Sequence, residues 1–155
     1  MKTLKVLSGK EMPNLKLNNS MTKKQITQLS YDITGCAIQV HKKLGPGLVE
    51  SVYEKCLKYE LIKNGFFVKQ QMIVPLIYDD LAFDTELRLD FLVIDCVVVE
   101  LKTVEHILPV REAQILTYME LLKVPQGLLF NFYSSNLIKT MKPFVNDYFS
   151  QLPAE

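Results

Sequence analysis

The sequence lacks the features that would place it among membrane or secreted proteins. No apolar run reaches the roughly 18 residues of a membrane span, and the N-terminus lacks the apolar core of a signal peptide. We therefore expect a soluble protein of the cytoplasm with no membrane partner. The chain also lacks an excess of charge, because 18 basic and 17 acidic residues give a formal net charge of +1. Such a balance exerts no overall attraction on polyanions, so any affinity for nucleic acid would come from a local basic face or from a bound metal.

Cysteine is scarce, and its pattern does not predict a disulfide framework. Cys36, Cys56 and Cys96 are odd in number, widely spaced and set in apolar runs. This pattern indicates reduced, buried thiols in a cytosolic protein, and we do not expect the three cysteines to be metal ligands.

Internal repeats and low-complexity segments are also lacking. The 155 residues, of which 48% are hydrophobic, suffice for one compact domain with a sizeable core. Residues 1–20 have mixed polarity and poor periodicity, so we expect a loosely attached N-terminal arm there and a single domain over residues 21–155.

The apolar positions predict the element order ααβββαβ. A first helix should begin after an N-cap at Thr22, because apolar residues then recur at three- and four-residue steps, and it should end at the Gly-Pro-Gly of residues 45–47. The remaining predictions are a helix over 48–64, strands over 66–78, 86–94 and 97–104, a helix over 109–122, a strand over 127–133 and a short helix around 143–151.

Charged residues interrupt two of the predicted strands. Asp90, Glu100 and Lys102 stand among apolar residues, where an unpaired buried charge would cost several kcal/mol, so these charges need a partner or a function. Side chains alternate along a strand, so Glu100 and Lys102 share a face. A three-residue turn over residues 94–96 would place Asp90 directly opposite Glu100, close enough for two carboxylates to share one ion. A two-residue turn would place them on opposite faces.

The spacing leaves an ordinary alternative open. Charged side chains are common on the wet face of a β-hairpin, where Lys102 could form a cross-strand ion pair with a carboxylate. The turn has no Asn-Gly or Asp-Gly pair that would force a two-residue loop, so the three-residue register is permitted without being required.

An Asp on one strand followed by Glu-x-Lys on the next resembles the PD-(D/E)xK nuclease superfamily. Residues 47–53 also match the Gly-x-x-Glu-x-x-Tyr signature of the small bacterial GxxExxY family. The resemblance covers residues 25–133, from a Val-His-Lys segment before the Gly-Pro-Gly to Glu-Ala-Gln-x-x-x-Tyr after the Glu-Leu-Lys strand. It implies an α/β (α+β) protein with a restriction-endonuclease-like αβββαβ core, in which a mixed central sheet is flanked by helices.

The resemblance further implies a metal-dependent nuclease that hydrolyses phosphodiester bonds of DNA or RNA. Asp90, Glu100 and the main-chain carbonyl of Leu101 would hold Mg²⁺ or Mn²⁺, since hard cations prefer oxygen ligands. Asp90, Glu100 and Lys102 would be catalytic, with Lys102 as the catalytic lysine. Gln114 matches a glutamine of nuclease relatives whose amide can orient that lysine, and it joins the catalytic set.

The helix before the strands would supply one more metal-binding acid. Glu50, the signature residue, is the first choice and Glu54 the second. Each acid has an ordinary explanation as well, because the helix dipole favours Glu50 in the first turn and Lys58 lies four residues after Glu54.

Four further residues are predicted to bind substrate. Arg88 shares a strand face with Asp90, and Arg111, Gln114 and Tyr118 share one face of the third predicted helix. Tyr53 could donate a hydrogen bond to a carboxylate or a phosphate, with a core aromatic as the alternative. The predicted substrate-binding residues are thus Arg88, Tyr53, Arg111 and Tyr118.

The expected partner is nucleic acid, with DNA favoured over RNA. The sequence shows no recognition helix, zinc finger or aromatic platform, so non-specific or structure-specific binding is expected. Two alternatives stay open: a non-catalytic nuclease-fold module that binds nucleic acid or a partner protein, and a small interaction protein whose acids only form ion pairs. A homodimer is also left open.

Overall fold

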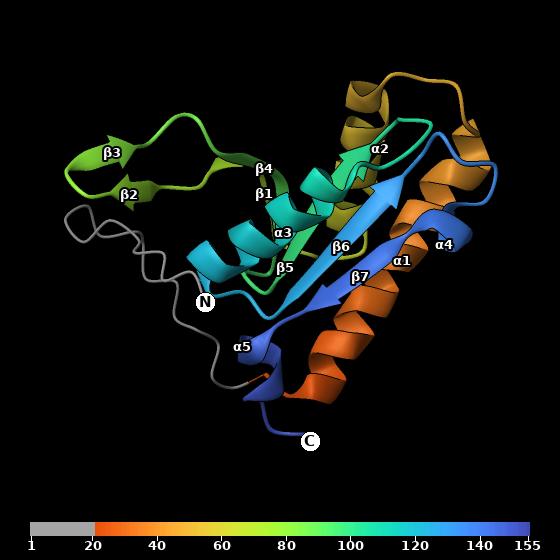
Figure 1. The fold of residues 1–155 in the computed structure, drawn as a ribbon. Coiled ribbons are helices and arrows are strands. Elements are labelled where there is room, and N and C mark those ends of the chain that lie inside the picture. The colour runs from red at the N-terminus through yellow and green to blue at the C-terminus, as the bar shows by residue number, and fades with distance from the viewer. Residues whose placement is uncertain (1–20) are drawn as a thin grey trace.

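A five-stranded mixed sheet forms the centre of the molecule (Figure 1). The structure is a computed structural model that describes residues 21–155; the predicted N-terminal arm lies outside the described residues. The strand order is β1-β4-β5-β6-β7, with β5 and β6 parallel and the other described neighbours antiparallel. The strands are β1 (Val68–Ile73), β4 (Arg88–Val93), β5 (Val97–Lys102), β6 (Gln126–Asn131) and β7 (Lys142–Val145).

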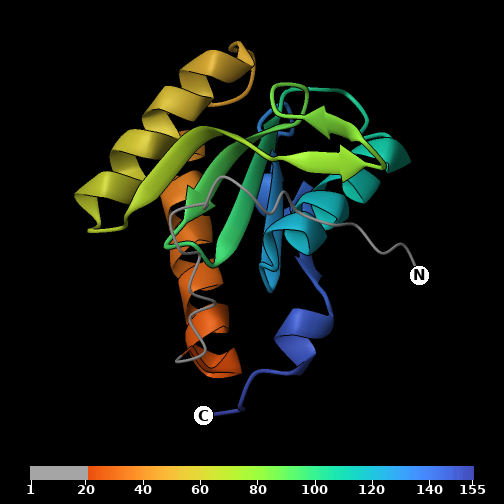
Figure 2. The ribbon, with the colours of Figure 1, turned by 90° about the vertical axis from the view of Figure 1, so that its left-hand side faces the viewer.

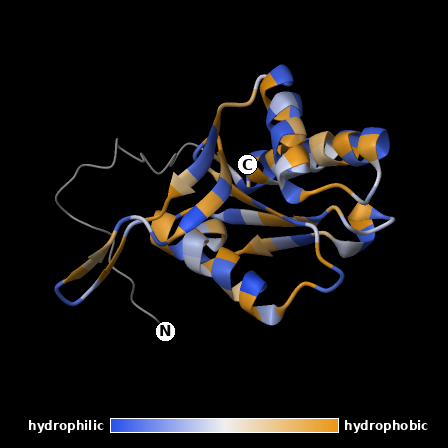
Figure 3. Ribbon diagram, turned by 90° about the horizontal axis from the view of Figure 1, so that it is seen from above, coloured by the Kyte–Doolittle hydropathy of each residue, from blue (hydrophilic) through white to orange (hydrophobic). Residues whose placement is uncertain are grey.

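Helices cover both faces of this sheet. Figure 2 shows α1 (Lys23–Leu44) and α2 (Glu50–Lys63) on one side of the strands and α3 (Pro109–Leu122) on the other. The core is accordingly divided into two clusters, one that includes Tyr53 and Phe91 and one that includes Leu92 and Met119. Hydrophobic and hydrophilic residues alternate in bands along the helices (Figure 3), as expected where one face is buried. This three-layer arrangement confirms the predicted mixed sheet flanked by helices.

The first helix has the predicted ends. The Thr22 hydroxyl accepts a hydrogen bond from the Gln25 amide at 3.1 Å, and the Gln25 side chain accepts one from the Thr22 amide at 2.9 Å, which completes a capping box. At the other end, Gly45 and Gly47 have φ values of 65° and 107°. Only glycine adopts such angles at low cost, so the predicted Gly-Pro-Gly stop sends the chain into α2.

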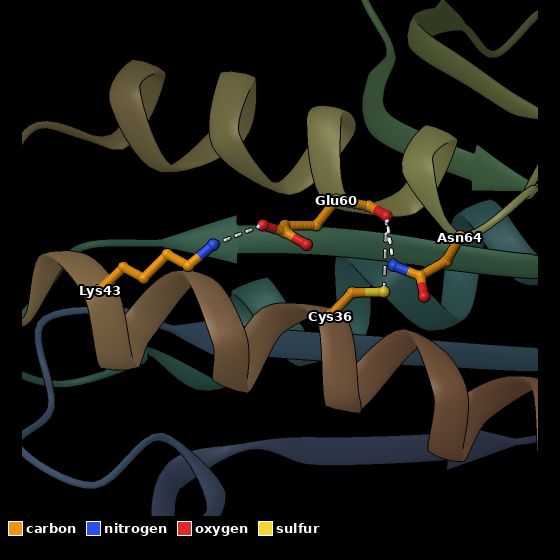
Figure 4. A network of polar contacts seen from close by, with 4 residues as sticks. All are labelled: Cys36, Lys43, Glu60 and Asn64. Carbon is orange, nitrogen blue, oxygen red and sulfur yellow. Dashed lines mark hydrogen bonds and ion pairs between the residues drawn. The ribbon is translucent and has the colours of Figure 1, made fainter.

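Polar contacts fix α2 against α1 (Figure 4). Lys43 Nζ lies 3.3 Å from Glu60 Oε1, and Glu60 is only 7% exposed. The Glu60 carbonyl accepts hydrogen bonds from the Asn64 side chain at 2.7 Å and from the Cys36 thiol at 3.9 Å. The contacts of Lys43 and Cys36 with Glu60 therefore hold the second half of α2 against α1.

Cys36 and Cys56 are free thiols, as the sequence predicted. Cys36 and Cys96 are buried, whereas Cys56 is only half-buried. No helix within residues 21–155 has the length and hydrophobicity needed to cross a bilayer.

The strand predicted over residues 66–78 is two strands. β1 ends at Ile73, and β2 (Leu76–Tyr78) pairs with β3 (Leu81–Phe83) in a separate hairpin that projects from the sheet (Figure 1). The Val74 amide still donates to the Leu87 carbonyl at 2.8 Å, but Pro75 has no N–H with which to extend the ladder. The prediction missed this break because it did not weigh Pro75.

The C-terminal prediction was also wrong in part. A helix was expected around residues 143–151, but α4 (Leu137–Thr140) is followed by β7 and only then by α5 (Asp147–Ser150). β7 pairs with β6 alone, and an edge strand tolerates Pro143. The helix begins after Asn146, whose side chain accepts a hydrogen bond from the Phe149 amide at 3.3 Å. The third helix, by contrast, has the predicted bounds.

Candidate active site

The β4–β5 hairpin has the three-residue turn that the site requires. Residues 94–96 form the turn, and Val93 pairs with Val97 beside it. Three steps along each strand from this pair place Asp90 opposite Glu100. The register that the sequence permitted is therefore the observed one.

Side-chain hydrogen bonds join the two strands at this position. Glu100 Oε1 accepts from the Asp90 amide at 3.2 Å, and Asp90 Oδ2 accepts from the Leu101 amide at 2.8 Å. Glu100 is only 6% exposed.

Burial changes the protonation of this acid pair. Burial and, second, the charge of Asp90 raise the pKa of Glu100 to about 9. Burial also raises the pKa of Asp90, although hydrogen bonds from Leu101 and Glu100 oppose the shift. Near neutral pH Glu100 therefore favours its protonated form, because burial and the neighbouring Asp90 carboxylate both disfavour a second negative charge.

Lys102 supplies a positive charge beside the pair. It is half-buried at the end of β5, and its charge lowers the pKa of Glu50, Asp90 and Glu100 against the effect of burial. Its carbonyl accepts a hydrogen bond from the Phe132 amide at 2.8 Å, so the parallel strand β6 holds its backbone. Among the predicted residues, Lys102 is the one whose charge acts on three separate acids.

A buried asparagine that the sequence analysis overlooked fixes the chain after Lys102. Asn131 pairs with Lys102 in the sheet and is 4% exposed. Its side chain accepts from the Val104 amide at 3.2 Å and donates to the Val104 carbonyl at 2.7 Å. An amide residue that ends the apolar run Gly-Leu-Leu-Phe was the available signal.

Both helical acids lie in this neighbourhood, in different roles. Glu54 Oε1 accepts hydrogen bonds from the side-chain amides of Gln70, at 3.1 Å, and Gln71, and the Gln71 amide nitrogen also lies 3.4 Å from Asp90 Oδ1. Glu50 has its pKa raised by burial, and its strongest charged neighbour is Lys102. Glu54 is thus joined to Asp90 through the Gln71 amide, whereas Glu50 is influenced by the charges of Lys102 and Asp90.

The predicted face of α3 also borders the acids. Gln114 Nε2 donates to the Tyr118 hydroxyl at 2.8 Å, and Arg111 Nη1 donates to Gln114 Oε1 at 3.5 Å. Tyr118 is 2% exposed, and burial followed by the charge of Glu100 raises its pKa. The positive charge of the exposed Arg111 lowers the pKa of Glu50 against the effect of burial. These three residues therefore form a hydrogen-bonded row between the buried acid pair and the surface.

The two remaining predicted substrate-binding residues are placed differently. The Arg88 side chain is exposed and forms no ion pair with any residue that the structure describes. Tyr53 is fully buried and stacks on Phe132 with ring centroids 4.6 Å apart. Its hydroxyl donates to the Gly45 carbonyl and accepts from the Leu48 amide. We correct its assignment, because a buried ring that clamps this turn has no surface left for a phosphate.

The carboxyl oxygens of this site suit a hard cation, but they do not form a complete coordination shell. Within the described range, no three His, Cys, Asp or Glu side chains gather closely enough to hold a metal ion as they stand. The chemistry nevertheless fits, because the half-buried Asp90 and the buried Glu100 offer adjacent carboxyl oxygens whose raised pKa values a bound cation would lower. Glu54 is the third acid, held beside Asp90 through the Gln71 amide.

Comparison with known proteins agrees with this geometry. Residues 27–143 match the sequence model of the PD-(D/E)XK nuclease superfamily. No match was found among curated proteins or solved structures. The matched range includes most of α1, all of α2, the β4–β5 hairpin that carries Asp90 and Glu100, and α3. Together with the five-stranded mixed sheet, it confirms the predicted restriction-endonuclease-like fold, and the chain belongs to the PD-(D/E)XK nuclease superfamily.

Proposed function

We propose that the protein is a metal-dependent nuclease that hydrolyses phosphodiester bonds, with DNA favoured as substrate, and that it belongs to the GxxExxY group of its superfamily. The observation that carries this proposal is the Asp90–Glu100 pair on the β4–β5 hairpin, in which each carboxyl group accepts a hydrogen bond from the opposite strand and has its pKa raised by burial. A hairpin that served only as a structural element would gain nothing from two acids with raised pKa values. In a nuclease superfamily member, the same pair is a site for a divalent cation.

The proposed ligands are Asp90, Glu100 and the Leu101 carbonyl, with Glu54 or Glu50 as the helical acid and Mg²⁺ or Mn²⁺ as the ion. When bound, such an ion would lower the pKa of a water molecule and neutralise charge that develops on the phosphate. Glu54 is preferred because it is tied to Asp90 by the Gln71 amide.

The chain's own residues would then orient the reactants. The Lys102 ammonium can donate hydrogen bonds to the attacking water or to a phosphate oxygen, where it stabilises the increasing negative charge. Gln114 and Tyr118 line the α3 side of the acids, and the Gln114 amide would orient the groups around Lys102. Arg111 and Arg88 are exposed, and their planar guanidinium groups can contact phosphate oxygens of the bound strand.

The projecting hairpin limits where the substrate can lie. Residues 75–87 carry four acidic residues and no basic residue. Figure 3 shows that the tip of this hairpin is hydrophilic. A phosphate backbone would be repelled there, so we place the substrate at the end of β5, near Lys102 and near Arg111 of α3.

One alternative retains a specific observation in its favour. Because residues 21–155 contain no ready cluster of three ligand side chains, the chain could be a non-catalytic module with the nuclease fold that binds nucleic acid or a partner protein. This alternative predicts binding of nucleic acid or protein without cleavage.

A cleavage assay separates the two functions. The full chain is incubated with labelled single-stranded, duplex and branched DNA and RNA in the presence of Mn²⁺, in parallel with Glu100→Ala and with the exposed control Glu105→Ala. We expect wild type and Glu105→Ala to cleave at equal rates and Glu100→Ala to be slower by at least about 100-fold. Equal cleavage by wild type and Glu100→Ala would reject the proposed site. Retention of nucleic acid without cleavage would favour the non-catalytic module.

A further inference from the structure

Gln71 has an unusual backbone conformation in the middle of β1. Its φ angle is 51°, in the left-handed region that side-chain-bearing residues rarely adopt. Its neighbours Gln70 and Met72 pair with Phe91 and Leu89 of β4, but Gln71 itself has no Cα partner in this described ladder. By this register Gln71 lies opposite Asp90. Strain of this kind persists only where the surrounding structure maintains it, and it is concentrated at functional sites.

The strained backbone explains an arrangement that a regular strand forbids. Consecutive side chains of a strand point to opposite faces. Here the amides of Gln70 and Gln71 both donate to the same oxygen, Glu54 Oε1. The left-handed residue turns the Gln71 side chain toward α2, and its amide nitrogen then also lies 3.4 Å from Asp90 Oδ1.

We propose that Gln71 is a positioning residue, which holds Glu54 of α2 against Asp90 of β4 so that both acids serve one divalent cation. This inference rests on the proposed function. One amide nitrogen carries two hydrogens and can therefore donate to two carboxylates at once. A lysine or an arginine could bridge the same acids, but its charge would neutralise them and compete with a cation. The neutral amide brings the two acids together and preserves their negative charge.

A merely structural role makes a different prediction from this one. If Gln71 only tied α2 to the sheet, Gln70 would be an equivalent residue, because it donates to the same Glu54 oxygen. Within residues 21–155, Gln70 forms no hydrogen bond with Asp90, and it has an ordinary strand conformation. The two glutamines therefore form a matched pair, in which only Gln71 joins both acids.

The test is a calorimetric titration of the full chain with Mn²⁺, together with thermal unfolding. Gln71→Gly relieves the backbone and removes the amide, so we expect an unchanged or raised Tm and a Mn²⁺ Kd at least about 10-fold weaker. Gln71→Asn keeps a residue that tolerates the left-handed conformation, but its side chain is one methylene shorter. We expect it to weaken Mn²⁺ binding to a similar extent. Gln70→Ala should change the Kd by less than about threefold.

A double variant shows whether Gln71 acts through Glu54. In a Glu54→Ala background, Gln71→Gly should cause no further increase in the Mn²⁺ Kd. Equal Kd values for wild type, Gln71→Gly and Gln71→Asn would overturn this inference alone, and so would a full additional loss in the Glu54→Ala background. Wild-type chain that binds no Mn²⁺ would overturn the proposed function together with it, so the two failures are distinguishable.

Discussion

Replacing Lys102 by alanine should slow phosphodiester cleavage by at least about 100-fold while the fold remains intact. Lys102 is half-buried beside Glu50, Asp90 and Glu100, and its positive charge lowers the pKa of all three acids. Removal of a donor that stabilises the transition state affects the chemical step more than substrate binding, so the loss should be in kcat with a smaller change in KM.

The measurement is a single-turnover cleavage rate with Mn²⁺, with circular dichroism and Tm as controls for folding. Lys24→Ala provides a matched control, because Lys24 is an exposed lysine at the far end of α1 that pairs only weakly with Glu155 at 3.5 Å. We expect Lys24→Ala to cleave like wild type. A Lys102→Ala protein that cleaves at the wild-type rate would exclude Lys102 as the catalytic lysine.

Replacing Glu100 by glutamine should stabilise the metal-free protein at alkaline pH. The pKa of Glu100 is about 9 in the folded chain, against 4.5 as its ordinary value. Between these values the folded chain keeps a proton that the unfolded chain has lost, so the free energy of unfolding falls as pH rises. Stability linked to this group is complete below about pH 4.5 and is lost progressively up to about pH 9. Glutamine is always neutral and removes the dependence.

The effect should be large enough to measure by urea unfolding. Between pH 5 and pH 8 we expect wild type to lose on the order of 1–3 kcal/mol more than Glu100→Gln, because each unit of pKa shift corresponds to about 1.4 kcal/mol. The raised pKa of Asp90 acts in the same direction. Glu105→Gln, at an exposed position, should follow wild type. A wild-type stability that is flat or rises between pH 5 and pH 8 would contradict the raised pKa of Glu100.

Much of the fold could be predicted from the chain because its signals are local. The apolar stripe, the Thr22 cap and the Gly-Pro-Gly stop define α1, and Pro109 defines the start of α3. The sequence permitted the three-residue turn without requiring it, and the observed turn, together with strand parity, places Asp90 opposite Glu100. These features depend on neighbours within a few residues or on a single hairpin.

The parts that were missed depend on contacts between distant segments. Tyr53 could equally have served a phosphate or the core, and only the fold shows that its hydroxyl holds the turn at Gly45. The strand β7 forms because residues 142–145 pair with the edge of β6 that β5 leaves free. Gln71 carries no sequence signal, because its left-handed backbone is maintained by Glu54 and Asp90 from two other elements.

A calorimetric titration with Mn²⁺ that compares wild type with Asp90→Asn tests the central claim most directly. Asparagine keeps the size of the side chain and one oxygen, which can still accept the Leu101 hydrogen bond, so the fold is preserved and only the charge is lost. Binding of one Mn²⁺ per chain to wild type, with a Kd at least about 100-fold weaker in Asp90→Asn, is the result that the buried acid pair predicts. Absence of binding to wild type, or equal affinity in the two proteins, would contradict it.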